Sequence, residues 1–141
     1  MFQNILLPVD LNQESSWQKA LPTAVEYCNA FGATLHVMNV VPDFGSALVG
    51  SYFPEGFEKK SLEDAREQLH DFVGQHVPDG VTVQHVVGYG TVYEEILRVA
   101  REIEADLILL AAHRPELKDF LLGPNAARVV RHFDGSVLVV R

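Results

Sequence analysis

The chain has 141 residues, of which 19 are acidic and 11 are basic, so its formal net charge is −8. We do not expect such a chain to bind nucleic acid or anionic membranes, because both need a basic surface. No apolar run approaches the ~18 residues that span a bilayer, and the first residues lack the pattern of a signal peptide. The single cysteine, Cys28, allows no internal disulfide, so we expect a cytoplasmic protein.

Five short segments are predicted to form strands. Several of them are apolar at nearly every position, which is typical of strands that are covered on both faces in a parallel sheet. In chain order they cover residues 5–9, 35–40, 81–87, 107–110 and 137–140.

Four helical segments separate these strands. The first covers residues 14–31, and we expect a kink or a restart at Pro22. The second covers residues 61–76, the third begins at Thr91 with a capping-box spacing to Glu94, and the fourth precedes the last strand.

The alternation of strands and helices predicts one three-layer α/β/α domain over residues 1–141, with a parallel sheet between two layers of helices. Residues 42–60 show no regular period and are predicted to form a long loop, which is a lid, a partner surface or part of the domain's own packing. Cys28 lies in an apolar helical stretch, and we predict that it is a core residue and not a nucleophile.

Ligands of an open parallel sheet bind beyond the carboxyl ends of its strands, so these ends are the first place to look for a site. Asp10 follows the first strand. Its carboxylate can accept hydrogen bonds from a base or a ribose, or hold a metal ion that bridges phosphates. The alternative is that Asp10 caps the following helix.

The loop after the fourth strand is a candidate anion site. It returns to a helix start after Gly123, where free N–H groups and the helix dipole favour an anion, and Arg114 can add a charge-assisted contact. Pro124 suits the first helical position but has no N–H. The alternative is an ordinary loop with a Gly-Pro helix start.

Catalytic and metal-binding signatures are not expected in this chain. It has neither a Walker A sequence nor a Gly-x-Ser-x-Gly nucleophile elbow. Its histidines are dispersed, and His70 and His76 are six positions apart and do not share a helix face well, so no metal site is predicted.

Taken together, these residues resemble the universal stress protein family over the whole chain. The segments that carry the resemblance are residues 4–10, 90–96, 105–110 and, most specifically, 121–140. With the run His113-Arg114-Pro115, the chain is similar to a bacterial subgroup of short, single-domain members.

The resemblance implies a five-stranded parallel sheet of order 3-2-1-4-5 and a crevice between strands one and four that holds ATP or AMP, with Mg²⁺ able to bind through the phosphates. It implies that Asp10 contacts the adenosine part and that backbone near Val40 and Val41 contacts the adenine. The predicted nucleotide-binding residues are Pro8, Val9, Asp10, Val40, Val41, Ala111, His113, Arg114, Gly123, Asn125 and Ala126.

The chain departs from the family's phosphate-loop pattern, which is Gly-x2-Gly-x9-Gly-Ser/Thr. Ala111 and Arg114 occupy the first two glycine positions, and the spacing to Gly123 is one residue shorter than in the pattern. Pro124 replaces the small hydroxyl residue, which removes a hydroxyl and an N–H donor.

Family members also pair through their last strand, so the resemblance implies a homodimer. The strand would otherwise be an exposed apolar edge, which favours aggregation. Its residues are Val137, Leu138, Val139 and Val140.

The leading hypothesis is an adenine-nucleotide-binding stress or regulatory protein that is not an enzyme. A second hypothesis is a slow ATP hydrolase with His113 near the chemistry, although the sequence shows no paired carboxylates and no obvious general base. A third is a nucleotide-free dimer that acts as an interaction module for a protein partner, which the altered glycine positions favour.

Overall fold

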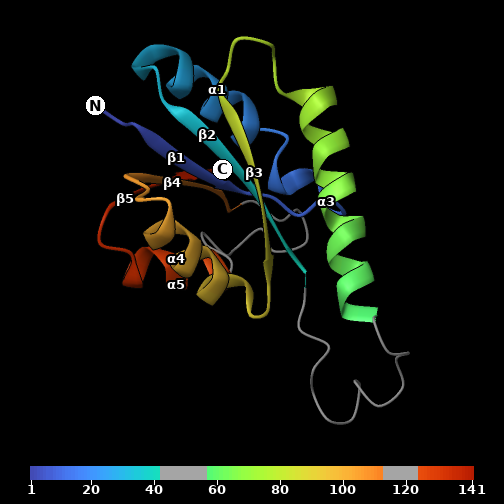
Figure 1. The fold of residues 1–141 in the computed structure, drawn as a ribbon. Coiled ribbons are helices and arrows are strands. Elements are labelled where there is room, and N and C mark those ends of the chain that lie inside the picture. The colour runs from blue at the N-terminus through green and yellow to red at the C-terminus, as the bar shows by residue number, and fades with distance from the viewer. Residues whose placement is uncertain (42–56, 113–123) are drawn as a thin grey trace.

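The computed structural model of the chain describes residues 1–41, 57–112 and 124–141. Within them, five strands form one parallel sheet in the order β3-β2-β1-β4-β5 (Figure 1), which confirms the predicted fold class and strand order. The strands are β1 (Asn4–Pro8), β2 (Thr34–Val41), β3 (Val83–Tyr89), β4 (Leu107–Ala111) and β5 (Ser136–Val140).

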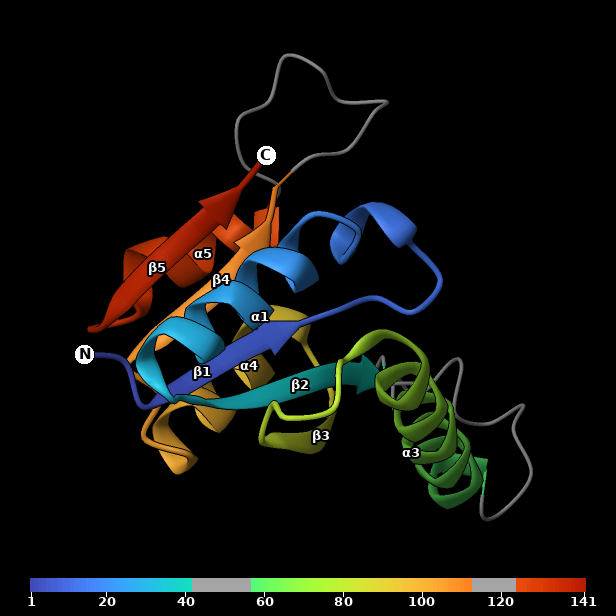
Figure 2. The same ribbon diagram turned by 90° about the horizontal axis from the view of Figure 1, so that it is seen from above.

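Helices cover both faces of this sheet, as Figures 1 and 2 show. One apolar cluster joins the sheet to α1 and α3, and a second cluster on the opposite face joins it to α4 and α5. The helices are α1 (Ala20–Phe31), α3 (Phe57–His76), α4 (Val92–Glu102) and α5 (Pro124–His132), and a short 3-10 turn, η1 (Glu14–Ser16), precedes α1.

The first predicted helix is divided as expected, but the division precedes Pro22. The 3-10 turn η1 ends at Ser16, and α1 begins at Ala20, which places Pro22 in its first turn. Proline is tolerated there because first-turn N–H groups have no partner within the helix. The helix ends where Gly32 adopts a positive φ of 67°, and its N–H donates to the Cys28 carbonyl at 2.8 Å.

One sequence-based helix start and one predicted capping contact are wrong. The helix α3 begins at Phe57 and not at Ser61, so residues 57–60, which were predicted to belong to the loop, are helical. The rest of the predicted loop, residues 42–56, lies outside the described residues. These four residues contain no helix breaker, and a helix therefore extends through them. Thr91 does precede α4, but its side chain makes no capping hydrogen bond, so the predicted capping box with Glu94 is not formed.

The strands β1 and β4 lie in the middle of the sheet and are buried on both faces. Ile5 and Leu7 pack in the cluster with α1 and α3, whereas Leu6 and Ile108 pack in the cluster with α4 and α5. Cys28 is 4% exposed, and burial raises the pKa of its thiol to about 11, which confirms a core residue. Among the described residues, no helix is long and apolar enough to cross a membrane.

Candidate functional site

The carboxyl ends of β1 and β4 mark the point where the direction of winding reverses. The two strands are neighbours and parallel. The helix after β1 packs on one face of the sheet, whereas the helix after β4 packs on the other (Figure 2). Ligands of open α/β sheets bind at such a switch point, and the carboxyl ends of β1 and β4 are called the β1–β4 edge below.

Strand register aligns several predicted residues along this edge. Pro8 pairs with Met38 of β2, and the Val9 N–H donates to the Met38 carbonyl, so Asp10 directly follows the paired end of β1. On its other side β1 pairs with β4 through Ile5 and Leu6. Asp10 therefore lies at the carboxyl end of a strand whose neighbours are β2 and β4.

The backbone of Asp10 is held by the turn that follows it. Its N–H donates to the Ser16 hydroxyl oxygen at 2.8 Å, and the same hydroxyl can donate to the Gln13 carbonyl at 2.7 Å or to the Asp10 carbonyl at 2.9 Å. One carboxylate oxygen, Oδ1, accepts the Asn12 N–H at 3.0 Å. This local turn fixes the side chain, but Asp10 does not cap the following helix as the alternative prediction had it, because the N-cap positions of η1 and α1 are Gln13 and Lys19.

The second carboxylate oxygen of Asp10 accepts no hydrogen bond in the described part of the chain, and the residue is exposed. The side chain thus combines a fixed orientation with a free acceptor at the switch point. Sequence reasoning found Asp10 but missed Ser16, for which the only signal was a hydroxyl residue in the turn after the strand.

The other edge residues present mainly backbone. Val9 is 6% exposed, and its N–H donates to the Met38 carbonyl at 2.8 Å, which extends the pairing of β1 beyond Pro8. Val41 is buried, and its carbonyl accepts the Gly90 N–H at 3.0 Å. A carbonyl oxygen has two lone pairs, so this oxygen keeps one for a further donor.

The β4 side of the edge is described only in part. Ala111 is half-buried, and the Ala112 N–H donates to the Val140 carbonyl at 3.0 Å. In the first turn of α5, Asn125 is half-buried and Ala126 is 6% exposed. The predicted contacts of His113, Arg114 and Gly123 lie outside the described residues.

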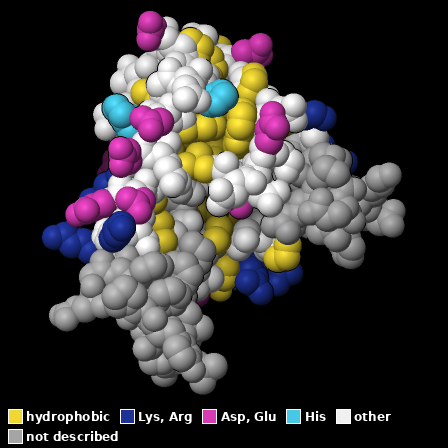
Figure 3. All heavy atoms as spheres, turned by 90° about the vertical axis from the view of Figure 1, so that its right-hand side faces the viewer, with side chains coloured by type: hydrophobic (Ala, Val, Ile, Leu, Met, Phe, Trp, Pro, Cys, Tyr) yellow, Lys and Arg dark blue, Asp and Glu magenta, His cyan; other side chains and the backbone are white. Residues whose placement is uncertain are grey.

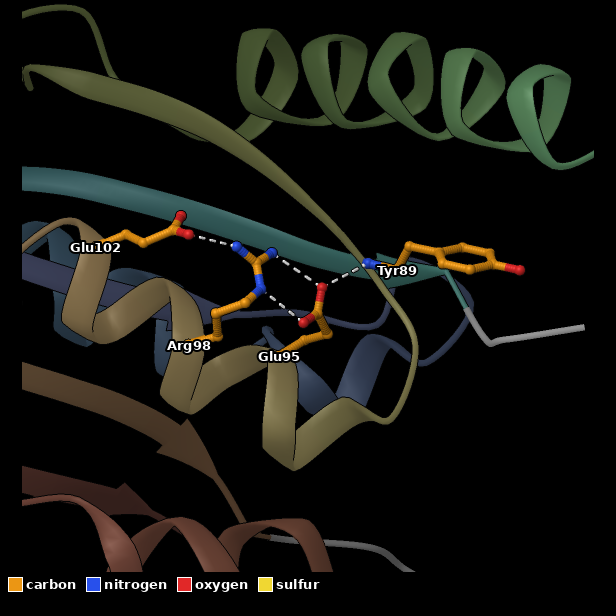
Figure 4. Close-up of polar contacts among 4 residues, drawn as sticks. All are labelled: Tyr89, Glu95, Arg98 and Glu102. Atoms are coloured by element: carbon orange, nitrogen blue, oxygen red, sulfur yellow. Dashed lines mark hydrogen bonds and ion pairs between the residues drawn. The ribbon is translucent and has the colours of Figure 1, made fainter. Parts of the chain in front are cut away.

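The Glu95 carboxylate of α4 holds the carboxyl end of β3 in place (Figure 4). Glu95 Oε1 accepts the Tyr89 N–H at 2.9 Å, and Arg98 donates to both Glu95 oxygens, through Nε at 2.8 Å and Nη2 at 2.9 Å. Arg98 Nη1 also donates to Glu102 at 2.7 Å. Gly88 leaves room for this contact, because a Cβ there would lie 3.3 Å from Glu95 Oε1.

Sequence reasoning missed this network, although it predicted α4. The hydrogen bond from Arg98 lowers the pKa of Glu95, and the Tyr89 N–H lowers it further, against the opposing effect of burial. The bond to Glu95 in turn raises the pKa of Arg98. The hydrogen bond from the Tyr89 N–H to Glu95 therefore fixes α4 to the carboxyl end of β3, and Arg98, which is on α4 as well, orients the Glu95 carboxylate.

An open depression at the opposite end of the sheet is a weaker candidate. It is lined by residues that precede the strands, including Phe2 and Asp106, and by residues at the end of α4, including Arg101. The Asp106 carboxylate there already accepts the N–H groups of Gln3 and Asn4, at 2.8 and 3.1 Å. Both carboxylate oxygens of Asp106 are thus already hydrogen-bonded to backbone at the start of β1. The β1–β4 edge, where Asp10 keeps a free oxygen, is the better candidate for a ligand site.

Comparison with known proteins agrees with this architecture. The family model described as Universal stress protein family matches residues 1–141. Universal stress protein G of Escherichia coli O157:H7 is 29% identical over 143 residues, covering 100% of both chains.

Two solved structures share the fold. A universal stress protein from Archaeoglobus fulgidus, described as a complex with dAMP, is 18% identical with a TM-score of 0.69 and covers 99% of this chain and 98% of its own. A universal stress protein described as a complex with cAMP is 21% identical with a TM-score of 0.61, covering 99% and 97%.

The fold defines an open parallel α/β protein with a topological switch point at the β1–β4 edge. The match along the whole chain shows its family: the chain belongs to the universal stress protein family. This confirms the resemblance inferred from the sequence.

We predict that Glu95→Gln destabilises the protein by about 1 kcal/mol at pH 7, because it weakens charge-assisted hydrogen bonds to a carboxylate that is itself largely shielded from water, although Arg98 is half-exposed. Glu102→Gln is the matched control. The Glu102 carboxylate binds the same arginine, but its side chain is 62% exposed, against 14% for Glu95. Glu102→Gln should therefore lower the free energy of unfolding by less than about 0.5 kcal/mol. Urea unfolding of the three proteins measures both values.

The stability difference between the parent and Glu95→Gln should depend on pH. Because the pKa of Glu95 is lowered from 4.5, its contribution is complete above pH 4.5 and is lost as the pH falls below that value. The stability difference between the parent and Glu95→Gln should therefore shrink on acidification below pH 4.5. A difference that stays constant down to pH 3 contradicts this assignment.

Proposed function

We propose that this protein binds an adenine nucleotide at the β1–β4 edge and acts as a cytoplasmic regulatory or stress protein, not as an enzyme. The observation that carries the proposal is Asp10. Its position at the switch point, fixed orientation and free Oδ2 match an acceptor for hydroxyl or amino donors of a nucleoside.

Relatives support the choice of ligand. The two solved family members described above are complexes with dAMP and with cAMP. These nucleotides share adenine and a furanose sugar but differ in the arrangement of phosphate. What they have in common is therefore the base and sugar side of the ligand, which we assign in this chain to Asp10 and to the backbone near Val40 and Val41.

The phosphates would lie toward the first turn of α5, where N–H groups without helical partners favour an anion. Pro124 supplies no N–H, so the donors of this turn are those of Asn125 and Ala126. We propose that adenosine recognition dominates and that either AMP or ATP is the ligand, with Mg²⁺ bound through the phosphates of ATP.

We predict that Asp10→Asn weakens AMP binding about tenfold or more. Asparagine keeps an Oδ1 acceptor for the Asn12 N–H but replaces the free carboxylate oxygen with an amide donor, so a charge-assisted hydrogen bond is lost. Asp79→Asn, an exposed change in the turn before β3, is the control for the loss of one charge. Calorimetric titration with AMP, ATP and adenosine measures the affinities.

Equal affinities of the parent and Asp10→Asn for all three ligands contradict the assignment of Asp10. If the parent binds none of them at millimolar concentration, the protein is instead a nucleotide-free interaction module.

We also propose a homodimer through β5. This strand forms one edge of the sheet, and its residues Val137, Leu138, Val139 and Val140 are all only half-buried. Val139 is the member of this group that packs against neither described core cluster. An apolar edge strand of this kind is protected when a second copy covers it.

Val139→Lys is predicted to convert the dimer to a monomer, because it places a charge in the apolar contact. Val130→Lys is the control, since Val130 is 44% exposed on α5. Sedimentation velocity at high protein concentration measures the mass of each variant. A monomeric parent protein contradicts the dimer.

A further inference from the structure

Two histidine rings from different elements lie together beside the edge strand β3. His70 is on α3 and His85 is on β3, and both are exposed. Their ring centroids are 5.3 Å apart, with the ring planes inclined by 44°. Strand register explains the position: His85 pairs with Val37, which is buried beneath α1 and α3, so His85 projects toward the face that α3 covers.

The ring nitrogens of this pair are available. Neither His70 nor His85 makes a hydrogen bond within the described part of the chain. Each neutral imidazole has one nitrogen with a free lone pair, which is the form that binds metal ions. The two rings thus bring two imidazole nitrogens together that can bind a metal ion. Because one ring is on a helix and the other on a strand, the distance between them can change little.

The ring separation allows a tetrahedral metal ion. A Zn–N distance of about 2.1 Å puts the metal about 3.2 Å from each ring centroid, so two ligands at a tetrahedral angle have centroids about 5.2 Å apart. A right angle between the ligands, as in square-planar coordination, would shorten this to about 4.5 Å. The observed 5.3 Å lies within the ordinary range for packed rings and allows the tetrahedral case when one nitrogen of each ring faces the ion.

We propose that His70 and His85 form a Zn²⁺ site that joins α3 to the edge strand β3. Imidazole ligands favour zinc over magnesium and calcium, which prefer oxygen. No group of three or more histidine, cysteine or acidic residues gathers to hold a metal in the described ranges, so water completes the coordination. The site is therefore a two-residue clamp and not a closed structural zinc site.

The net charge of the chain, −8, favours a cation, because an acidic protein raises the local concentration of cations. Figure 3 shows the side of the molecule on which α3 lies, where histidine and acidic side chains occur close together. The described part of α3 exposes four acidic residues, Glu63, Asp64, Glu67 and Asp71, and three basic residues, Lys59, Lys60 and Arg66.

The test is calorimetric titration of the nucleotide-free, EDTA-stripped protein with Zn²⁺. One ion per chain should bind, and His70→Gln and His85→Gln should each weaken binding at least tenfold. His132→Gln, an exposed change on α5, and His76→Gln, on the same helix as His70, are the controls and should bind as the parent does.

A second readout follows from linkage. Zn²⁺ at ten times its dissociation constant should raise the melting temperature of the parent by about 4 °C and leave His85→Gln unchanged. Asp10→Asn should show the full rise, so the zinc site can be tested apart from the nucleotide site.

Three results overturn the proposal. One is a parent protein that does not bind Zn²⁺ at millimolar concentration. Another is equal binding by the parent and His85→Gln. The third is loss of binding in His76→Gln with binding kept in His85→Gln, which would assign the ion to a different pair of histidines.

Discussion

The structure depends on burying β1 and β4 on both faces. Ile5, Leu6 and Leu7 are fully buried, and so are Ile108 and Leu109, so neither strand can present a face to water. Helices must then cover both sides of the sheet, and the helices that follow these two neighbouring strands lie on opposite faces. This divergence of the two helices creates the switch point. Asp10 lies there because it is the polar residue that follows the apolar run of β1.

The same property made the fold predictable from the sequence. Nearly continuous apolar runs identify strands covered on both faces, and their alternation with helical segments specifies a parallel sheet. The boundaries were less predictable, because Ser61 is a good capping residue that lies within a helix, and Thr91 has the spacing of a capping box without its hydrogen bond. Capping signals are local, whereas the start of a helix depends on its whole surroundings.

The candidate site was predictable only where it follows directly from strand ends. Asp10 and Val41 could be found because each terminates an apolar run. The contacts of Glu95 with Tyr89 and of His70 with His85 could not, because they depend on how a helix is placed against β3. His113, Arg114 and Gly123 stay predictions, since they lie outside the described residues.

The most direct measurement of the central claim is the nucleotide content of freshly purified protein. The protein is denatured, and the released small molecules are separated by ion-exchange chromatography and quantified against protein. The account predicts a near-equimolar adenine nucleotide, and its phosphate count distinguishes AMP from ATP. Release of no nucleotide, together with no binding of added AMP or ATP, would contradict a nucleotide site at the β1–β4 edge.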